Sequence, residues 1–178
     1  EAGAGRSALT GGQGDYGGGL SPAGAETLRR YAGLVVDAGG LENSGALMFT
    51  RNTAIAPFDD PEVRTAFKEV VDRQQLVDVV MRGAGEVGDD MVGKGLPGYD
   101  AELDSRTLDA DAAAEVFAAH GVTDLGIVVA EMIPGLTDAT TLLQQQLADA
   151  GVTLTITEAD PTTLYSDLSV VYGSQLFA

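Results

Sequence analysis

The sequence predicts an α/β fold, a single lobe with a central mixed sheet flanked by helices. The main observation is a repeated unit in the last third of the chain. There "DADAAAEVFAAHGVTDLGIVV" and then "TDATTLLQQQLADAGVTLTIT" each have the pattern of a capped helix, a glycine and an apolar strand. Helices that alternate with strands over such short connections are typical of layered α/β domains with parallel strand pairs. A hydrophobic content of 44% in 178 residues is enough for a packed core.

The first quarter of the chain predicts helices and two short strands. A Gly-rich opening leaves room for a short helix around Ser7 and Leu9. The segment "SPAGAETLRRYAG" is typical of a helix, with Ser21 as N-cap, Pro22 in the first helical position and Gly33 after the last. Two apolar runs of strand length follow, at residues 34–36 and 46–49.

The stretch "NTAIAPFDDPEVRTAFKEVVDRQQLVDVV", residues 52–80, predicts two helices. Asp60 is expected to cap the first, which is predicted over residues 61–72 with Pro61 at its start. Its apolar positions recur at helical spacing and should form one buried face: Val63, Ala66, Phe67, Val70 and Val71. A second helix is expected from Arg73 to about Met81, burying Leu76, Val77 and Val80.

The same signals predict the elements of the last third. Helices are expected over residues 111–120, 140–150 and 161–172, and strands over residues 125–130 and 152–157. Thr137 should cap the second of these helices, and Gly121 and Gly151 should end the first two. His120 lies in the last helical turn before Gly121, where a cation favours the helix dipole, so it is expected to have a capping role.

Charge and composition exclude several classes of function. The chain has 10 Lys and Arg against 27 Asp and Glu, a net charge of −17, which repels phosphate backbones and anionic lipid. Nucleic acid is therefore not an expected partner, and the simplest role of the charge is solubility. The absence of cysteine excludes disulfides and thiolate metal sites. Both ends look cut, so we expect an excised piece of a longer protein.

Two glycine-rich motifs resemble nucleotide sites but lack the required context. "GAGEVG", from Gly83 to Gly88, matches the dinucleotide pattern, which needs a strand before it and a helix after it. "GDDMVGKG", from Gly88 to Gly95, is close to a P-loop, but Gly95 replaces the magnesium-binding Ser or Thr. A small acidic enzyme or nucleotide-binding domain that uses the Gly83–Gly95 loop stays as the alternative function.

No enzyme signature remains among the other residues. One histidine and no cysteine leave little for a catalytic triad or a transition-metal site. The acidic pairs Asp59-Asp60 and Asp89-Asp90 lack the alternating spacing of a calcium loop. We therefore expect a protein that is not an enzyme and that has no cofactor and no metal. A pure interaction module, such as a sensor lobe that docks a kinase or chaperone, is a third hypothesis.

The stretch of residues 52–80 resembles the hallmark segment of the family 5 extracellular solute-binding proteins. These proteins are the peptide, oligopeptide and nickel receptors of ABC importers. The matching residues are Asn52-Thr53, Pro57-Phe58-Asp59-Asp60, Val63-Arg64-Thr65-Ala66 and Asp72-Arg73. Other segments match the family in the same order, including "GDYGGGLSP", "PGYDAEL", "LDADAAAEVFAAHGV" and "LLQQQLADAGVTLTI".

The resemblance implies a lobe of the periplasmic-binding-protein type II. Residues 1–178 would form the second lobe of a two-lobed receptor, and the Pro-Phe-Asp-Asp stretch would be scaffold and not a binding site. The implied partners are a peptide-like or other small solute, the permease subunits of an ABC importer, and the first lobe of the same protein. The implied location is extracytoplasmic, as a periplasmic protein or a cell-surface lipoprotein.

The expected ligand site lies where strands end, because open α/β sheets bind ligands beyond the carboxyl ends of their strands. The predicted site residues are Phe49, Thr50, Arg51, Glu131, Met132 and Ile133. Met132 and Ile133 would offer apolar contact, while Glu131 and Arg51 would orient polar ends of the solute. Peptide receptors of the family often have a basic residue after the strand that corresponds to "LGIVVA", whereas this chain has Glu131.

Overall fold

The computed structural model describes residues 2–37, 45–88, 90, 91, 93, 94, 96–100, 102, 106–164 and 166–178. The described helices are α1 (Ala2–Thr10), α2 (Pro22–Leu28), α3 (Pro61–Val70), α4 (Arg73–Gln75), the π-helix η2 (Leu76–Val80), α5 (Ala110–Ala119), α6 (Leu136–Asp149), α7 (Pro161–Leu164) and α8 (Ser169–Tyr172). The described strands are β1 (Thr50–Arg51), β2 (Asp124–Val129), β3 (Thr153–Glu158) and β4 (Leu176–Phe177).

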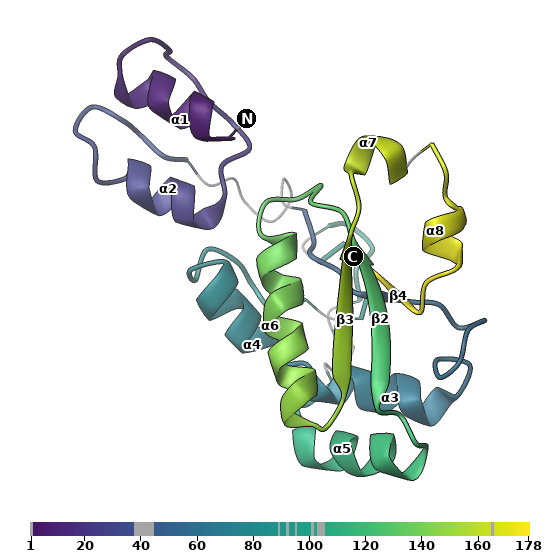
Figure 1. Ribbon diagram of the computed structural model, residues 1–178. Coiled ribbons are helices and arrows are strands. Elements are labelled where there is room, and N and C mark those ends of the chain that lie inside the picture. Colours follow the sequence, from purple (N-terminus) through teal and green to yellow (C-terminus); the bar gives the residue numbers. More distant parts are fainter. Residues whose placement is uncertain are drawn as a thin grey trace.

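The four strands form one mixed sheet in the order β1-β4-β2-β3. Strand β2 pairs in parallel with both β3 and β4, whereas β1 pairs antiparallel with β4. Figure 1 shows α6 along the sheet, α3 and α5 across its lower end, and α1 and α2 set apart near the upper end of α6. The expected mixed α/β sheet with parallel strand pairs is confirmed.

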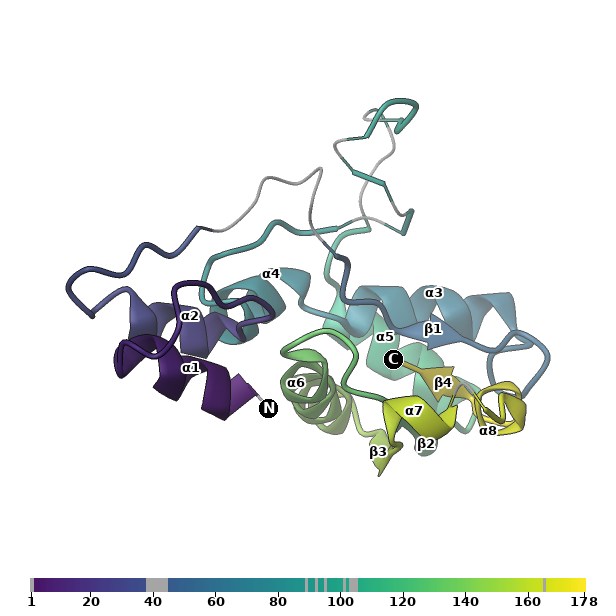
Figure 2. The same cartoon turned by 90° about the horizontal axis from the view of Figure 1, so that it is seen from above.

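The main core lies between the sheet and the helices α3, α5 and α6. It contains buried residues of the sheet and of these helices, together with Phe58 from the turn before α3; its large side chains include Phe58, Phe67, Phe117, Leu143 and Leu147. A smaller cluster of Val128, Ala130 and Leu164 lies on the other face of the sheet, with Val171 and Phe177 against it. Seen from above in Figure 2, α7 and α8 lie on the side of β4 away from α3.

The Pro-Phe-Asp-Asp stretch is scaffold, as expected. Phe58 is fully buried and meets the ring of Phe67 edge to face at 5.4 Å between centroids. Asp60 caps α3 by accepting a hydrogen bond from the Glu62 N–H at 2.7 Å. All five residues of the predicted apolar face of α3 are buried. The residues of this stretch thus cap α3 and fill the core beneath it.

His120 has the predicted place at the end of a helix and an additional contact. It is the C-cap residue of α5, and Gly121 follows with a φ of 67°. Its ring nitrogens lie 3.3 Å from Asp60 Oδ2 and 3.0 Å from Glu62 Oε2, at the start of α3. The imidazole thus links the end of α5 to the beginning of α3, the helix against which α5 packs.

Two predicted strands are wrong. Residues 34–36 form no strand, and the side chain of Val35 is almost fully exposed, because no neighbouring strand pairs with this segment. The strand expected at residues 46–49 instead occupies Thr50 and Arg51, because pairing is set by the partner strand β4 and not by the apolar run itself. The strands β2 and β3 lie within one residue of their predicted bounds.

Several helix predictions also need correction. The helix expected from Arg73 to Met81 is one turn of α-helix followed by the π-helix η2. Helix α2 ends at Leu28, before the expected Gly33. The helix expected over residues 161–172 is broken into α7 and α8, and Asp167 accepts a hydrogen bond from the Ser169 N–H at the second start. Helix α6 begins at Leu136, so Thr137 lies in its first turn and is not its cap.

Candidate functional site

The sheet edge that carries the predicted site is built from the carboxyl ends of β2, β3 and β4. At this edge the Ala130 N–H donates to the carbonyl of Ala178 at 3.1 Å, so the end of β4 lies beside the end of β2. Residues 130–135 then lead from β2 into α6, whose amino end faces the same side (Figure 1). This is the edge at which open α/β sheets bind ligands.

The carboxylate of Glu131 forms hydrogen bonds with the end of this loop and the start of α6. Its two oxygens accept hydrogen bonds from the Gly135 N–H at 2.8 Å, the Thr137 N–H at 2.7 Å and the Thr137 hydroxyl at 2.7 Å. Partial burial by itself raises the pKa of Glu131, but the hydrogen bonds from Thr137 and Gly135 outweigh it, so the pKa lies below its ordinary value. Glu131 therefore caps α6, because the N-cap residue Gly135 has no side chain to do so.

Met132 and Ile133 belong to this loop, and Phe49 immediately precedes β1. Met132 is 40% exposed, so it is accessible from solvent. Ile133 is half-buried and approaches Gly45, where an added Cβ would lie 3.4 Å from the Ile133 Cδ1. Phe49 packs against both the main core and a second cluster of Val80, Ala139 and Leu142.

The direction of β1 separates Phe49 from Thr50 and Arg51. Because β1 is antiparallel to β4, Thr50 lies opposite Phe177 and Arg51 lies opposite Leu176, one step farther from the edge. Only the amino end of β1, at Phe49, is at the level of the β2 and β4 ends. The expectation that this strand presents its carboxyl end to the same edge is therefore wrong.

Arg51 belongs to a basic cluster outside the loop. Its guanidinium carbon lies 5.7 Å from the centroid of the Phe67 ring. Burial is the main cause that lowers the pKa of Arg51; the charge of Asp90 opposes this, and those of Arg73 and Arg64 add to it. Arg51 thus interacts with the Phe67 ring and with the charge of Asp90 within the chain.

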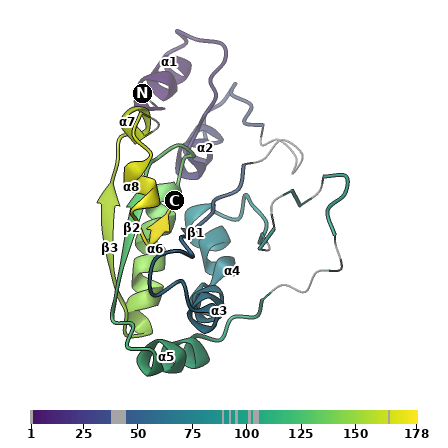
Figure 3. The same cartoon turned by 90° about the vertical axis from the view of Figure 1, so that its right-hand side faces the viewer.

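Asp90 is the centre of this basic cluster. Its carboxylate lies 2.5 Å from the Lys68 Nζ and 2.8 Å from the Arg73 Nη2. Partial burial raises the pKa of Asp90, but the hydrogen bonds and charges of Lys68 and Arg73 outweigh it and hold the pKa below its usual value. The Arg73 Nη1 is buried and has no hydrogen-bond partner among the described residues. Figure 3 shows the described parts of the segment around Asp90 extending away from the sheet.

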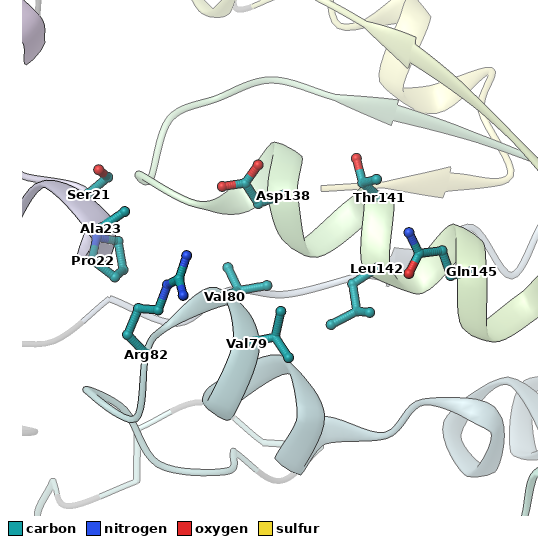
Figure 4. Close-up of a pocket in the computed structure, with 10 residues that line it drawn as sticks. All are labelled: Ser21, Pro22, Ala23, Val79, Val80, Arg82, Asp138, Thr141, Leu142 and Gln145. Atoms are coloured by element: carbon teal, nitrogen blue, oxygen red, sulfur yellow. The ribbon is translucent and has the colours of Figure 1, made fainter. Parts of the chain in front are cut away.

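An open cavity of about 330 Å³ lies at the amino end of α6, and we name it the α6 cavity. Its lining residues come from the start of α2, from η2 and the residues after it, and from the first three turns of α6: Ser21, Pro22, Ala23, Val79, Val80, Arg82, Asp138, Thr141, Leu142 and Gln145. Figure 4 shows Arg82 and Asp138 on facing walls, with Val79, Val80 and Leu142 forming an apolar side. Its size is at the lower end of small-molecule sites.

The position of the α6 cavity depends on tight packing between η2 and the start of α6. Gly135 has a φ of 101°, and an added Cβ would lie 3.3 Å from the Val80 Cγ1, so this site requires glycine. Val80 and Leu142 then form the apolar wall of the α6 cavity and share a cluster with Phe49. None of the six residues predicted from sequence lines the cavity, although Phe49 packs beneath it. The sequence signals that bear on it are the helix start at Pro22 and the polar Asp138 beside an apolar helix face.

The glycine-rich motifs have no nucleotide-site geometry. Gly83 follows the π-helix η2 and not a strand, and the described residues between Arg82 and Asp109 include no helix that could face a phosphate. Gly95 lies outside the described residues. Within the described part of the chain there is no group of three or more metal-ligating side chains, and none of the helices is long and apolar enough to cross a membrane.

The arrangement is similar to that of solved periplasmic binding proteins of type II. NikA from Brucella suis in complex with Fe(III)-EDTA matches with a TM-score of 0.75 at 16% identity, over 99% of this chain and 39% of that one. The oligopeptide-binding protein AppA from Bacillus subtilis in complex with a nonapeptide matches with a TM-score of 0.75 at 15% identity, over 99% and 38%. DppA from Helicobacter pylori in complex with the peptide STSA matches with a TM-score of 0.70 at 19% identity, over 89% and 31%.

These likenesses show the fold, and the sequence shows the family. The sequence model of the bacterial extracellular solute-binding proteins, family 5 Middle, matches residues 1–173. The chain therefore belongs to family 5 of the bacterial extracellular solute-binding proteins. It spans less than two-fifths of the length of the three structures above. A search of curated proteins found no match.

Proposed function

We propose that this chain is the second lobe of an ABC-importer receptor that captures peptide-like solutes outside the cytoplasmic membrane and delivers them to the permease. Membership of family 5 carries the proposal, because that family consists of solute-binding proteins. Two of the similar structures hold peptides, and both are binding proteins and not enzymes. A periplasmic location or a lipid anchor at the cell surface, and a first lobe that covers this one, belong to the same proposal.

The α6 cavity supports the proposal from within the chain. It lies where α6 meets η2 and the start of α2, and its lining combines apolar side chains with two charged groups. Because it is open on one side, a solute bound there stays partly in contact with water until a second lobe covers it. The nucleotide alternative has no matching support, since its loop lacks the strand and helix that phosphate binding needs.

The six residues predicted from sequence remain part of the proposal. Met132 is exposed and Ile133 half-buried at the edge, so both can reach a solute. Glu131 caps α6 and Arg51 contacts Phe67, so a solute would have to share them with these internal contacts. Unchanged affinity in both Glu131→Ala and Arg51→Ala, measured on the two-lobed protein, would remove these two from the site.

Calorimetry on the two-lobed protein tests the proposed function. We expect micromolar binding of peptides from a pool of two to five residues, and no binding of ATP or NAD. Micromolar binding of ATP or NAD that is lost in Gly93→Ala would instead support the nucleotide alternative. If no peptide binds and a nickel or iron chelate does, the solute is a metal chelate and not a peptide, and the receptor function still holds.

A further inference from the structure

Arg82 has a backbone conformation that its residue type does not favour. Its φ is 53°, and it is the only residue other than glycine with a positive φ in the described part of the chain. It follows η2 at the position where helices commonly end in a left-handed residue, and there the missing Cβ of glycine avoids a steric cost. The turn is closed by backbone groups alone, since the Gly83 N–H donates to the Val77 carbonyl at 3.0 Å.

The side chain of Arg82 contributes nothing to this turn. It is exposed, and within the described residues it makes no hydrogen bond and no ion pair. The guanidinium points into the α6 cavity in Figure 4, into the space between Pro22, Asp138 and Val80. Asp138, from the first turn of α6, faces the cavity from the opposite wall and likewise has no ion-pair partner among the described residues.

Several other cations have partners within the chain. Arg30, Lys68 and Arg73 each form an ion pair with a carboxylate of the chain, and Arg64 donates to backbone carbonyls. Among the described residues Arg82 has no such partner, and the same is true of Arg6, Arg29 and Arg106; what sets Arg82 apart is that it also has a positive φ and lines the α6 cavity. Its backbone conformation costs stability relative to glycine, and no contact with the described residues offsets that cost. A strained residue that lines a cavity points to function.

We propose that Arg82 binds the carboxylate of the solute in the α6 cavity. This inference rests on the proposed function and adds to it a residue and a ligand group. A guanidinium can hold a carboxylate through two parallel hydrogen bonds, a geometry that lysine cannot reproduce. Val79, Val80 and Leu142 then offer contact to an apolar group beside that carboxylate, and Asp138 favours a positive group across the cavity. The ligand class is a zwitterionic or carboxylate-bearing solute with a small apolar part.

Three variants of the two-lobed protein separate the backbone of Arg82 from its charge. Arg82→Gly removes both the strain and the charge, Arg82→Ala removes the charge and keeps the strain, and Arg82→Lys keeps both. The probes are a pool of tripeptides with free carboxylates and the same pool with carboxy-terminal amides. Calorimetry measures affinity, and thermal unfolding without peptide measures stability.

We expect the wild type to bind the free-carboxylate pool about ten-fold or more tightly than the amide pool, as loss of a charged hydrogen bond predicts. Both Arg82→Gly and Arg82→Ala should lose this preference, and Arg82→Lys should keep part of it. The melting temperature should rise by about 1–4 °C in Arg82→Gly only, because the left-handed strain is relieved there. Arg29→Gln, which removes the same charge from the end of α2 outside the cavity, should change neither quantity.

The outcomes distinguish this inference from the proposed function. Peptide binding with an unchanged carboxylate preference in Arg82→Gly would overturn the role of Arg82 and leave the receptor function intact. A wild type that binds neither pool would overturn both the peptide class and the role of Arg82. A melting temperature of Arg82→Gly below that of the wild type would show that the arginine is kept for stability, which also overturns the inference.

Discussion

Glu131 offers a direct test of whether the loop after β2 serves the fold. The carboxylate accepts three hydrogen bonds from Gly135 and Thr137 at the start of α6. The change Glu131→Ala removes all of them and leaves the first turn of a 14-residue helix without a side-chain cap. Glu131→Gln keeps the shape of the side chain and removes the charge that favours a helix amino end.

The expected loss follows from the size of capping interactions. Glu131 is on the exposed side of the loop, so water can replace part of what the alanine variant loses. The cost should therefore be close to that of a lost helix cap, about 1–2 kcal/mol of the free energy of unfolding. For a chain of this length that corresponds to a fall in melting temperature of about 2–8 °C.

The pH dependence gives the second part of the test. Because the pKa of Glu131 is lower in the folded chain than its ordinary value of 4.5, the carboxylate stabilises the fold fully above that pH. The contribution is lost as the pH falls through the folded pKa. The difference in stability between wild type and Glu131→Gln should thus be constant near pH 7 and shrink as the pH falls below about 4.5.

Urea unfolding followed by circular dichroism measures these differences in the 178-residue chain. Glu115→Ala and Glu115→Gln are the matched controls, because Glu115 is exposed on α5 and has no hydrogen-bond partner among the described residues. A loss in Glu131→Ala no greater than in Glu115→Ala would refute the capping role. A Glu131 difference that does not change with pH would refute the charge argument.

Three further predictions follow from the core, the basic cluster and the open site. Phe67→Ala should lower the free energy of unfolding, measured in urea, by about 3–5 kcal/mol, because Phe67 is 1% exposed and packs edge to face on Phe58. A loss under about 1 kcal/mol would contradict that packing. Asp90→Asn should lower the free energy of unfolding by about 0.5–1 kcal/mol, and by less at high salt. The greater stability of the wild type should disappear as the pH falls below the usual pKa range of an aspartate. Equal stability of the two proteins at low salt would contradict the pairing of Asp90 with Lys68 and Arg73. The 178-residue chain should unfold cooperatively with a melting temperature that sub-millimolar peptides do not shift, because in the proposed two-lobed receptor this chain makes only part of the contacts to the solute. A shift at micromolar peptide would show a complete site in this chain.

Local sequence determined the features that depend on neighbouring residues. Asp60 caps α3 and Gly121 ends α5 because a cap and a left-handed turn involve only the residues beside them. The buried face of α3 follows from helical spacing, and Phe67 lies on it as predicted. The family could also be inferred from sequence, since the motif at residues 52–80 is a contiguous pattern.

Tertiary structure decided the features that depend on distant partners. The apolar run at residues 46–49 satisfies a strand pattern, but the hydrogen bonds of β4, more than 120 residues away, place the strand at Thr50 and Arg51 in the antiparallel direction. Residues 34–36 have the same kind of pattern and no partner, so they form no strand. Strand pairing is a long-range interaction, and the pattern of one segment cannot specify its neighbour.

The candidate site shows the same division. Glu131 follows a strand, as a ligand-binding residue would, but its carboxylate turns back to cap α6 because Gly135 cannot. The α6 cavity joins residues near 22, 80 and 140, which come together only when α2, η2 and α6 pack. The strain at Arg82 is a backbone angle that no residue pattern reveals. The residue pattern thus led to the loop after β2, while packing decided that Glu131 caps α6 and that Arg82 and Asp138 line the α6 cavity.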